Sequence, residues 1–211
     1  MNLLPRSLTL LAISLTWVLP AAAQTAAQPA ATTVPAIPPR AVPATGGASP
    51  HETISAHIGS GRNAPLVTIT YGRPYSKKPG TTEVRKVWGT LVPWEQVWRL
   101  GSDEATTLIS QNDMVFGDTT IPAGAYTLFM LPSEKGTSQL IINKRLGQWG
   151  IPYDDADKKG EFAHIDLKKD TIEKSVDELT LAVVNDTASG GGIIKIQWET
   201  TQFSVAFKLK P

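Results

Sequence analysis

Short segments in which apolar and polar residues alternate recur along this chain, and they constrain its fold more than any other feature. In 66–71, Val67 and Ile69 lie on one face of an extended chain, with Thr68 and Thr70 on the other. A period of two is typical of a strand with one buried face. Glycine- and proline-containing turns separate such segments, which recur at 105–110, 125–131, 139–143, 162–167, 179–184, 193–198 and 203–209. We therefore expect an all-β domain, either an antiparallel β-sandwich or a barrel-like fold.

Helical features are confined to two segments. Residues 93–98 predict a short helix, with Pro93 in its first turn and Gly101 just past its end. Residues 146–159 contain Gly147, Gly150 and Pro152, so we expect a long loop there with room for one turn.

The N-terminus has the pattern of a secretory signal peptide over residues 1–23. Arg6 is followed by an apolar run at 8–19, and Pro20 by three alanines that form a small-residue cleavage site. The run is shorter than the roughly 20 apolar residues that span a membrane. We expect cleavage after Ala23 and an exported protein, periplasmic or secreted, with no membrane span in its mature form. An uncleaved anchor is the alternative.

Residues 24–50 are dominated by Ala, Pro, Thr and Gly, and Arg40 is their only charged residue. Such a segment has little large apolar surface to bury, so we expect a disordered linker. The composition changes near His51, and we place a single all-β domain at 51–211.

Composition excludes several classes of function. The formal net charge is +1, whereas a nucleic-acid-binding domain is expected to be clearly basic. Without cysteine the chain has no disulfide, thiol nucleophile or thiolate metal site. It also lacks a phosphate-binding loop, a dinucleotide fingerprint and a nucleophile elbow. The sequence therefore predicts no cofactor and no nucleic-acid partner.

Two groups of residues raise the question of a metal, and we predict none. Acidic residues at 154, 155 and 157 suit a hard cation such as calcium, but they lack the EF-hand order and two lysines follow them, which favours a solvated loop. A zinc centre requires His51, His57 and His164 to converge in space, and His164 lies in a predicted strand.

A tryptophan-rich stretch at 88–107 holds the candidate functional site. Three of the six tryptophans lie at 88–98, followed by Arg99, Asp103 and Glu104. An arginine beside aromatic rings and carboxylates suits a small polar or carbohydrate-like ligand. The alternative is structural: Arg99 and Glu104 form an internal ion pair, and the tryptophans are packing anchors. The candidate ligand-binding residues are Tyr71, Arg73, Trp98, Arg99, Asp103, Glu104 and Trp149.

Three functions are compatible with this stretch. The first is a non-enzymatic binding module of the cell envelope. The second is a hydrolase that uses Glu104 or Asp103 as acid or base, which requires two carboxyl groups across an open cleft. The third is a structural or protein-interaction domain, which would expose an apolar patch.

The joined motifs of this chain resemble an exported bacterial family known as domain of unknown function 2911. The resemblance rests on Val67-Thr-Ile-Thr-Tyr-Gly-Arg-Pro74 and Val87-Trp-Gly-Thr-Leu-Val-Pro-Trp-Glu-Gln-Val-Trp-Arg-Leu-Gly-Ser-Asp-Glu-Ala-Thr-Thr107, and it continues through 121–128, 142–150 and 198–199. It covers about 54–209. The family pattern often has Asn at the position of Asp103 and Thr at that of Leu100. The resemblance implies an exported all-β domain and supplies no activity.

Overall fold

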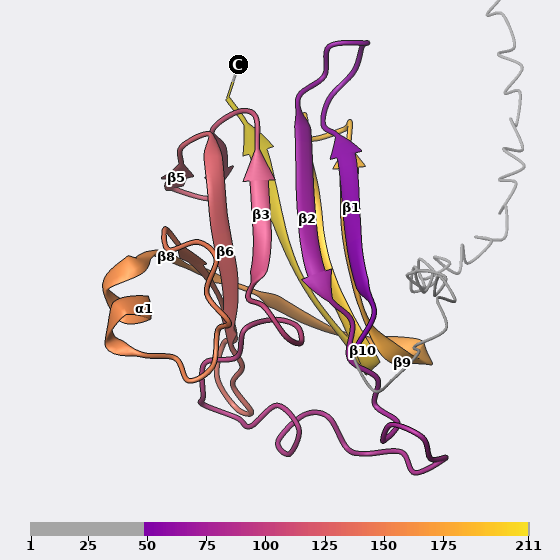
Figure 1. The fold of residues 1–211 in the computed structure, drawn as a ribbon. Helices are drawn as coiled ribbons and strands as arrows, with labels where there is room; N and C mark the ends of the chain where they lie inside the picture. The colour runs from indigo at the N-terminus through magenta and orange to yellow at the C-terminus, as the bar shows by residue number, and fades with distance from the viewer. Residues whose placement is uncertain (1–48, 211) are drawn as a thin grey trace, which may run out of the picture. The chain divides into compact units, whose positions relative to one another are not determined.

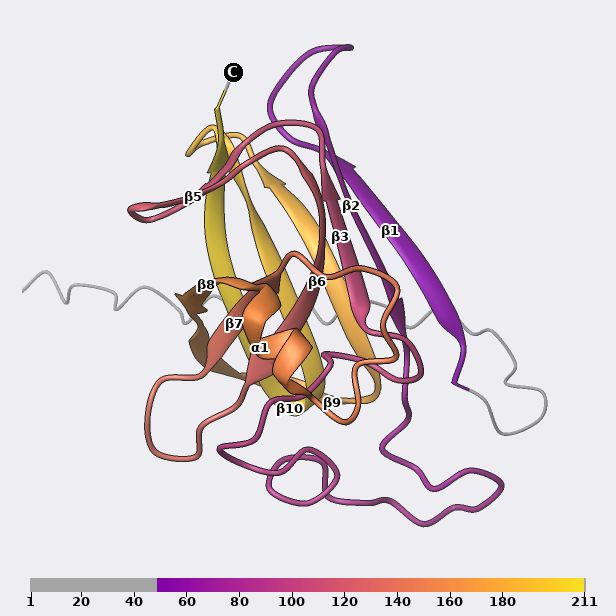
Figure 2. The same cartoon turned by 60° about the vertical axis from the view of Figure 1, so that its left-hand side comes forward.

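The structure, a computed structural model, describes residues 49–210, which form two packed antiparallel β-sheets and one short helix (Figures 1 and 2). The first sheet has the order β1-β2-β3-β6-β7-β8 and the second β5-β4-β10-β9. The bounds are β1 His51–His57, β2 Leu66–Gly72, β3 Thr106–Ser110, β4 Met114–Phe116, β5 Thr119–Ile121, β6 Gly124–Leu131, β7 Gln139–Asn143, α1 Asp155–Gly160, β8 Glu161–Asp166, β9 Lys168–Asp186 and β10 Gly191–Leu209. The predicted sandwich with one short helix is confirmed. The predicted signal peptide, and all but the last two residues of the predicted linker, lie outside the described residues.

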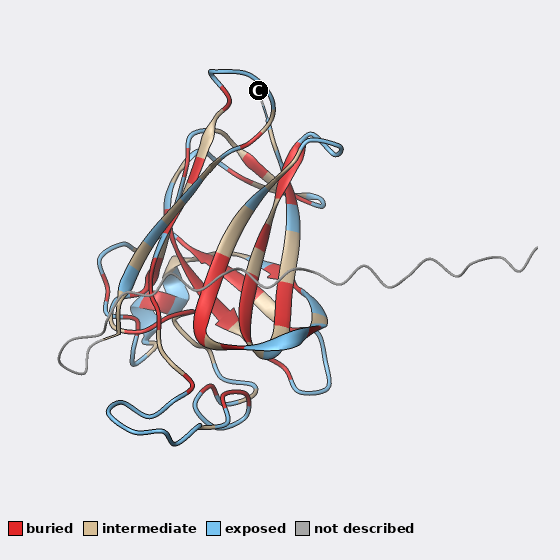
Figure 3. Cartoon of the chain, turned by 90° about the vertical axis from the view of Figure 1, so that its right-hand side faces the viewer, coloured by how far each residue is buried: buried red, intermediate tan, exposed pale blue. Residues whose placement is uncertain are grey.

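The alternating segments form strands because one face of each packs between the sheets. In β2, Val67 and Ile69 are fully buried, whereas Thr70 is exposed on the outer face. The second sheet contributes side chains such as Ile194 and Ile196 to the same core. Figure 3 shows buried residues running through the strands, with mostly exposed loops at one end. β1, β4 and β5 were not predicted, since β4 and β5 have three residues each and β1 alternates only between exposed and half-buried.

The last two predicted strands are one continuous strand, β10, which pairs with β9 in a long hairpin. The register shifts on both sides of Glu199, whose φ is 51°. This β-bulge bends the strand without ending it. The Glu199 carboxylate accepts a 2.9 Å hydrogen bond from the backbone N–H of Val87, so the bulge also holds the tryptophan-rich segment.

The helix lies in the segment expected to be a loop, and the predicted helix at 93–98 is wrong. Glu95 has a φ of 59°, and Trp98 exchanges two 2.8 Å backbone hydrogen bonds with Met130 of β6. Pairing with the sheet replaces the helical hydrogen bonds there. At 155–160 the helix begins because Asp154 and Asp157 form a capping box. Within residues 49–210, no helix is long and apolar enough to cross a membrane.

Aromatic rings from distant parts of the chain close one end of the sandwich. Trp98 stacks on Trp198 of β10 at 5.9 Å between centroids, and Trp88 meets the edge of Phe203 at 5.1 Å. Trp94 stacks on Trp88 at 6.0 Å, beneath the ammonium group of Lys169. Stacked and edge-to-face pairs are the favoured geometries, so these rings work as packing anchors.

The end of β2 touches the loop that follows the tryptophans, because Gly72 has no side chain. A Cβ atom on Gly72 would overlap the carbonyl oxygen of Ser102 and lie 2.5 Å from its hydroxyl oxygen. The backbone N–H of Ser102 donates to the carbonyl of Gly72 at 3.3 Å. This contact fixes where the 99–105 loop leaves the sheet.

We expect Gly72→Ala to destabilise the domain by about 1–3 kcal/mol, because the new methyl group forces two backbones apart. The measurement is the thermal melting of Gly72→Ala against Gly136→Ala. At Gly136 an added Cβ would approach only the end of the Ser133 side chain, at 3.0 Å, so its loss should be smaller. Equal losses for the two variants would contradict the close approach as the cause.

Candidate functional site

A depression of about 350 Å³ opens on the outer face of the first sheet, where β1 begins and β2 ends. His51 and Glu104 both line it and contact each other, with 2.9 Å between Nε2 and the carboxylate. Their side chains are 46% and 61% exposed, so both are accessible to a ligand. Thr70 and Thr107 are register partners on β2 and β3. The full lining is His51, Thr70, Tyr71, Gly72, Glu104, Ala105 and Thr107.

Glu104 carries a negative charge in this depression at neutral pH. A hydrogen bond from its own backbone N–H, and then the hydrogen bond from His51, lower the pKa of the Glu104 carboxyl below its ordinary value. An ionised carboxylate accepts hydrogen bonds and donates none. The site therefore suits a ligand that donates hydrogen bonds, such as a hydroxyl or an amine.

Arg99 and Trp149 form a second feature beside the depression. The guanidinium carbon lies 5.8 Å from the Trp149 ring centroid, and Trp149 is 53% exposed. Burial lowers the pKa of Arg99, whereas the Asp103 and Glu104 carboxylates act in the opposite direction. The predicted ion pair with Glu104 is replaced by the contact of Glu104 with His51.

Close backbone packing joins this arginine–tryptophan pair to the wall of the depression. A Cβ atom on Gly150 would lie 2.8 Å from Cβ of Arg99 and 3.2 Å from Cβ of Ala105. The N–H of Ala105 donates to the carbonyl of Gln148 at 3.1 Å. Trp149 is therefore held next to the depression by residues on both sides of it in sequence.

The 99–105 loop and the neighbouring Gln148 contain buried oxygen atoms without a hydrogen-bond partner among the described residues. They are one carboxylate oxygen of Asp103, the hydroxyl of Ser102 and the side-chain oxygen of Gln148. Asp103 also has a φ of 63°, in the left-handed region. Buried polar atoms are normally hydrogen-bonded. The loop thus keeps hydrogen-bonding capacity that the protein does not use internally.

Arg73, a predicted ligand-binding residue, lies inside the sandwich instead. It is 2% exposed, and its guanidinium lies 3.2 Å from the Glu52 carboxylate of β1 and 3.0 Å from that of Glu178 of β9. Its Nε donates to the carbonyl of Leu179 at 3.2 Å. Burial raises the pKa of Glu178 in spite of the adjacent guanidinium. Arg73 is therefore a structural residue that joins the two sheets.

Tyr71 and Trp98 are also mainly structural. The Tyr71 hydroxyl donates to Glu52 at 2.9 Å and accepts from the N–H of Leu181 at 3.0 Å, and burial raises its pKa. Tyr71 lines the depression, yet it is only 1% exposed. Trp98 is one of the aromatic rings that close one end of the sandwich, and its indole N–H donates to the carbonyl of Gly101 at 3.2 Å. Of the seven predicted residues, Glu104 and Tyr71 line the depression, and Arg99, Asp103 and Trp149 lie beside it.

His51, Thr70 and Thr107 were not predicted as site residues. His51 was considered only as a zinc ligand, and it meets Glu104, 53 residues away, only because β1 pairs with β2 and β2 with β3. The zinc hypothesis is wrong for the described residues, because His164 lies on β8 at the opposite edge of the sheet from β1. His164 lines a separate depression of about 320 Å³.

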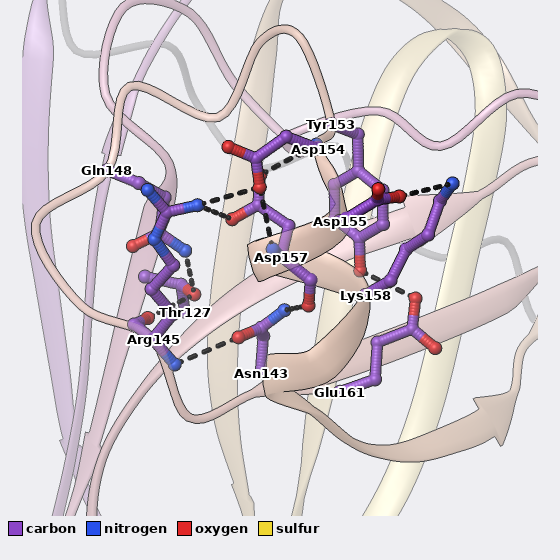
Figure 4. Close-up of polar contacts among 10 residues, drawn as sticks. All are labelled: Thr127, Asn143, Arg145, Gln148, Tyr153, Asp154, Asp155, Asp157, Lys158 and Glu161. Carbon is purple, nitrogen blue, oxygen red and sulfur yellow. Dashed lines mark hydrogen bonds and ion pairs between the residues drawn. The ribbon is translucent and has the colours of Figure 1, made fainter.

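The acidic residues at 154–157 form the N-terminus of α1, as Figure 4 shows. One guanidinium nitrogen of Arg145 lies 2.9 Å from a carboxylate oxygen of Asp154 and 2.9 Å from one of Asp157. The Asn143 side chain donates to the carbonyl of Asp157 at 2.7 Å. Asp157 is 1% exposed, so the expected solvated loop is in fact a packed helix cap. Within 49–210, no three His, Asp or Glu side chains are grouped to hold a metal ion.

Comparison with known proteins identifies the family. A family described as protein of unknown function (DUF2911) matches residues 49–207. The chain therefore belongs to the DUF2911 family, as the motifs at 67–74 and 87–107 indicated. The match extends from just before β1 into β10 and so includes both sheets. No curated protein and no solved structure matches the chain.

We expect Arg73→Met to destabilise the domain by about 3–5 kcal/mol, because it leaves the Glu52 and Glu178 carboxylates without their buried partner. Glu104→Gln is the matched comparison and should change stability by about 1 kcal/mol or less, since its ion pair is exposed. Urea unfolding followed by circular dichroism measures both. An Arg73 variant as stable as the Glu104 variant would contradict the structural role.

We expect Asp157→Ala to cost about 1–3 kcal/mol, because the N–H of Asp154 and the guanidinium of Arg145 lose a buried acceptor. Asp155→Ala is the control, since its side chain is 89% exposed and should matter little. Calcium chloride or EDTA should leave the melting temperature of the wild type unchanged. A calcium-dependent rise that Asp157→Ala abolishes would show that a cation binds there.

Proposed function

We propose that this DUF2911 domain is an exported, non-enzymatic binding module of the cell envelope, and that it binds a small hydroxylated, carbohydrate-like ligand in the depression lined by His51 and Glu104. The observation that carries the proposal is the accessible Glu104 carboxylate, held by His51 and flanked by an exposed tryptophan. The N-terminal pattern at 1–23 supports export.

The ligand class follows from three neighbouring groups. The Glu104 carboxylate accepts hydrogen bonds, and hydrogen bonds to a charged group are the stronger ones. Thr70 and Thr107 offer hydroxyl groups that can donate or accept. Trp149 offers a flat apolar face with a polar edge, which suits the apolar face of a sugar ring. Together they match a molecule with several hydroxyl groups and one apolar face.

The sheet surface around the depression favours a ligand without strong charge. The hydroxyl groups of Thr53 and Thr70 are 2.9 Å apart, as are those of Ser55 and Thr68. The outer face of β1, β2 and β3 carries no Lys, Arg, Asp or Glu at the register positions of these residues. A hydroxyl-rich face of this kind offers donors and acceptors but no fixed charge.

The hydrolase alternative is less well supported. A general acid needs a pKa near the working pH. For a carboxyl group, burial usually provides this by raising the pKa. Glu104 is exposed, and its pKa is lowered. Asp103 directs one carboxylate oxygen into the buried loop. We therefore favour a role of Glu104 in binding.

A protein-interaction role is supported by a separate observation. Leu146, Trp149 and Ile151 are each about half exposed on one short segment. Exposed apolar groups that lie together often mark interaction sites. In this second candidate function, Trp149 contacts a protein, and mutation of Ile151 weakens binding as much as mutation of Trp149.

We expect millimolar to micromolar binding of neutral mono- or oligosaccharides, and about a tenfold or greater loss of affinity in Glu104→Gln, because a charge-assisted hydrogen bond contributes about 1.5–3 kcal/mol. Isothermal titration with glucose, galactose, N-acetylglucosamine and their oligomers measures this. Trp149→Ala should also weaken binding.

Ile151→Ala is the control for loss of exposed apolar surface, and Glu134→Gln is the control for loss of exposed charge; both should bind normally.

Affinity should be constant at neutral pH and should fall only below the ordinary glutamate pKa of about 4.3, since protonation removes the acceptor and the Glu104 pKa is lowered. Failure of every saccharide to bind, or equal affinity in Glu104→Gln, would contradict the proposal.

A further inference from the structure

We propose that two copies of the domain associate through β1, which pairs with the β1 strand of the second copy in antiparallel orientation about a two-fold axis at Ile54. β1 is the terminal strand of the six-stranded sheet and lies at its edge in Figures 1 and 2. The inference does not rest on the proposed ligand.

The hydrogen bonds that flank β1 show which backbone groups face outward. The N–H of Arg73 donates to the carbonyl of Pro50 at 2.7 Å, and the N–H of Ile58 donates to the carbonyl of Pro65 at 2.9 Å. Both pairs continue the β1–β2 register, in which His51 is opposite Gly72. In an antiparallel pair, hydrogen-bonded and non-hydrogen-bonded positions alternate. Even-numbered residues of β1 therefore bond to β2, and the N–H and C=O groups of residues 51, 53, 55 and 57 point away from it.

This edge lacks most of the features that normally prevent strands from pairing; its one carboxylate, Glu52, is turned inward onto Arg73. Proteins protect exposed edges with proline, lysine, β-bulges or very short strands. β1 has seven residues, contains neither proline nor lysine, and pairs with β2 without a register shift. Its outward-facing side chains at Thr53 and Ser55 are small. β1 therefore offers free backbone groups to a second strand at residues 51, 53, 55 and 57.

The strand is nearly symmetric about Ile54, which favours a second copy of the same chain over another partner. Its sequence reads His-Glu-Thr-Ile-Ser-Ala-His. Pairing about Ile54 places Thr53 opposite Ser55 of the second copy, and His51 opposite its His57. All four of these residue positions expose their backbone groups at the free edge, so each pair can exchange two hydrogen bonds. A two-fold interface requires this kind of self-complementarity.

The arrangement also extends the outer face described above. Thr53 and Ser55 already form hydroxyl contacts with β2, and the second copy continues the same row of hydroxyl groups. His57 of the second copy comes beside His51, which lines the depression. Each depression then lies next to a residue from the other copy.

A single cysteine tests both the association and its register, because the chain has none of its own. In the proposed pairing Ile54 faces Ile54 at a non-hydrogen-bonded position, where Cα atoms are about 4.5 Å apart. That distance allows a disulfide. Ile54→Cys should therefore form a covalent dimer on mild oxidation. Ala56→Cys is the control and should not cross-link. In the proposed pairing the two copies of residue 56 are four positions apart along the strands, about 13 Å, which is too far for a disulfide.

Proline at an outward-facing position tests the backbone contacts. Ser55→Pro removes an N–H that points to the free edge and leaves the bonds to β2 intact, which is where proline is tolerated in a sheet. Ser55→Ala removes the same hydroxyl and keeps the N–H. In sedimentation velocity over a range of concentrations, wild type and Ser55→Ala should form dimers, and Ser55→Pro should be a folded monomer by circular dichroism.

The proposal is overturned if the wild type stays monomeric at millimolar concentration, or if Ala56→Cys cross-links as readily as Ile54→Cys. It is also overturned if a folded Ser55→Pro still dimerises, because another surface then makes the contact. A monomer that dimerises only after residues 24–48 are removed would show that the chain's own N-terminal segment occupies the edge. Cross-linking of Ile54→Cys alone remains decisive if Ser55→Pro does not fold.

Discussion

The buried guanidinium of Arg73 is the interaction on which the rest of the domain depends. It binds carboxylates from the first strand and from β9, together with the backbone of Leu179, 106 residues away in sequence. A charge in this position is strongly disfavoured unless it is paired and fully hydrogen-bonded. The sheets must therefore meet in one relative position for Arg73 to be satisfied. Burial of the Glu178 carboxylate remains unfavourable even beside the arginine, since burial raises the pKa of Glu178.

The position of the candidate site follows from that constraint. Gly72 precedes Arg73 and lets the Ser102 loop contact the end of β2. Glu104 then emerges two residues after Ser102, within reach of His51 at the start of β1. A rigid core thus sets the position of an exposed loop, as is common where a site is carried by loops. Two charged residues of neighbouring motifs thus have different roles: Arg73 is buried and structural, whereas Glu104 is accessible.

The sequence allowed prediction of the fold class because alternation is a local property. In β2, Val67 and Ile69, which were predicted to share a face, are fully buried, and Thr70 on the other face is exposed. The helix prediction at 93–98 failed because tertiary contacts decide the backbone there. Pro93 and Gly101 matched helix-end preferences, but pairing of Trp98 with Met130 prevents a helix. At 146–159 the glycines and the proline indicated a loop. The short helix α1 begins after them, at the capping box of Asp154 and Asp157.

Prediction of the site was limited by the distance in sequence between its members. Glu104 and Trp149 stood out because a carboxylate or a tryptophan is chemically distinctive on its own. His51 did not stand out, since its hydrogen bond to Glu104 forms only when β1 is paired with β2. Arg73 was assigned to the site because sequence shows its charge and not its burial. Local chemistry identifies candidates, and only non-local pairing separates ligands from structural residues.

The connection between Arg73 and β9 also makes the first strands depend on residues near the C-terminal end of the domain. The first sheet begins with β1 and β2, near the start of the domain, whereas Glu178 and Leu179 are made more than a hundred residues later. Until those residues are available, an N-terminal fragment contains an arginine beside a single carboxylate and one uncovered sheet face. A chain that is interrupted before β9 has its first strands but lacks the partner that holds them against the second sheet.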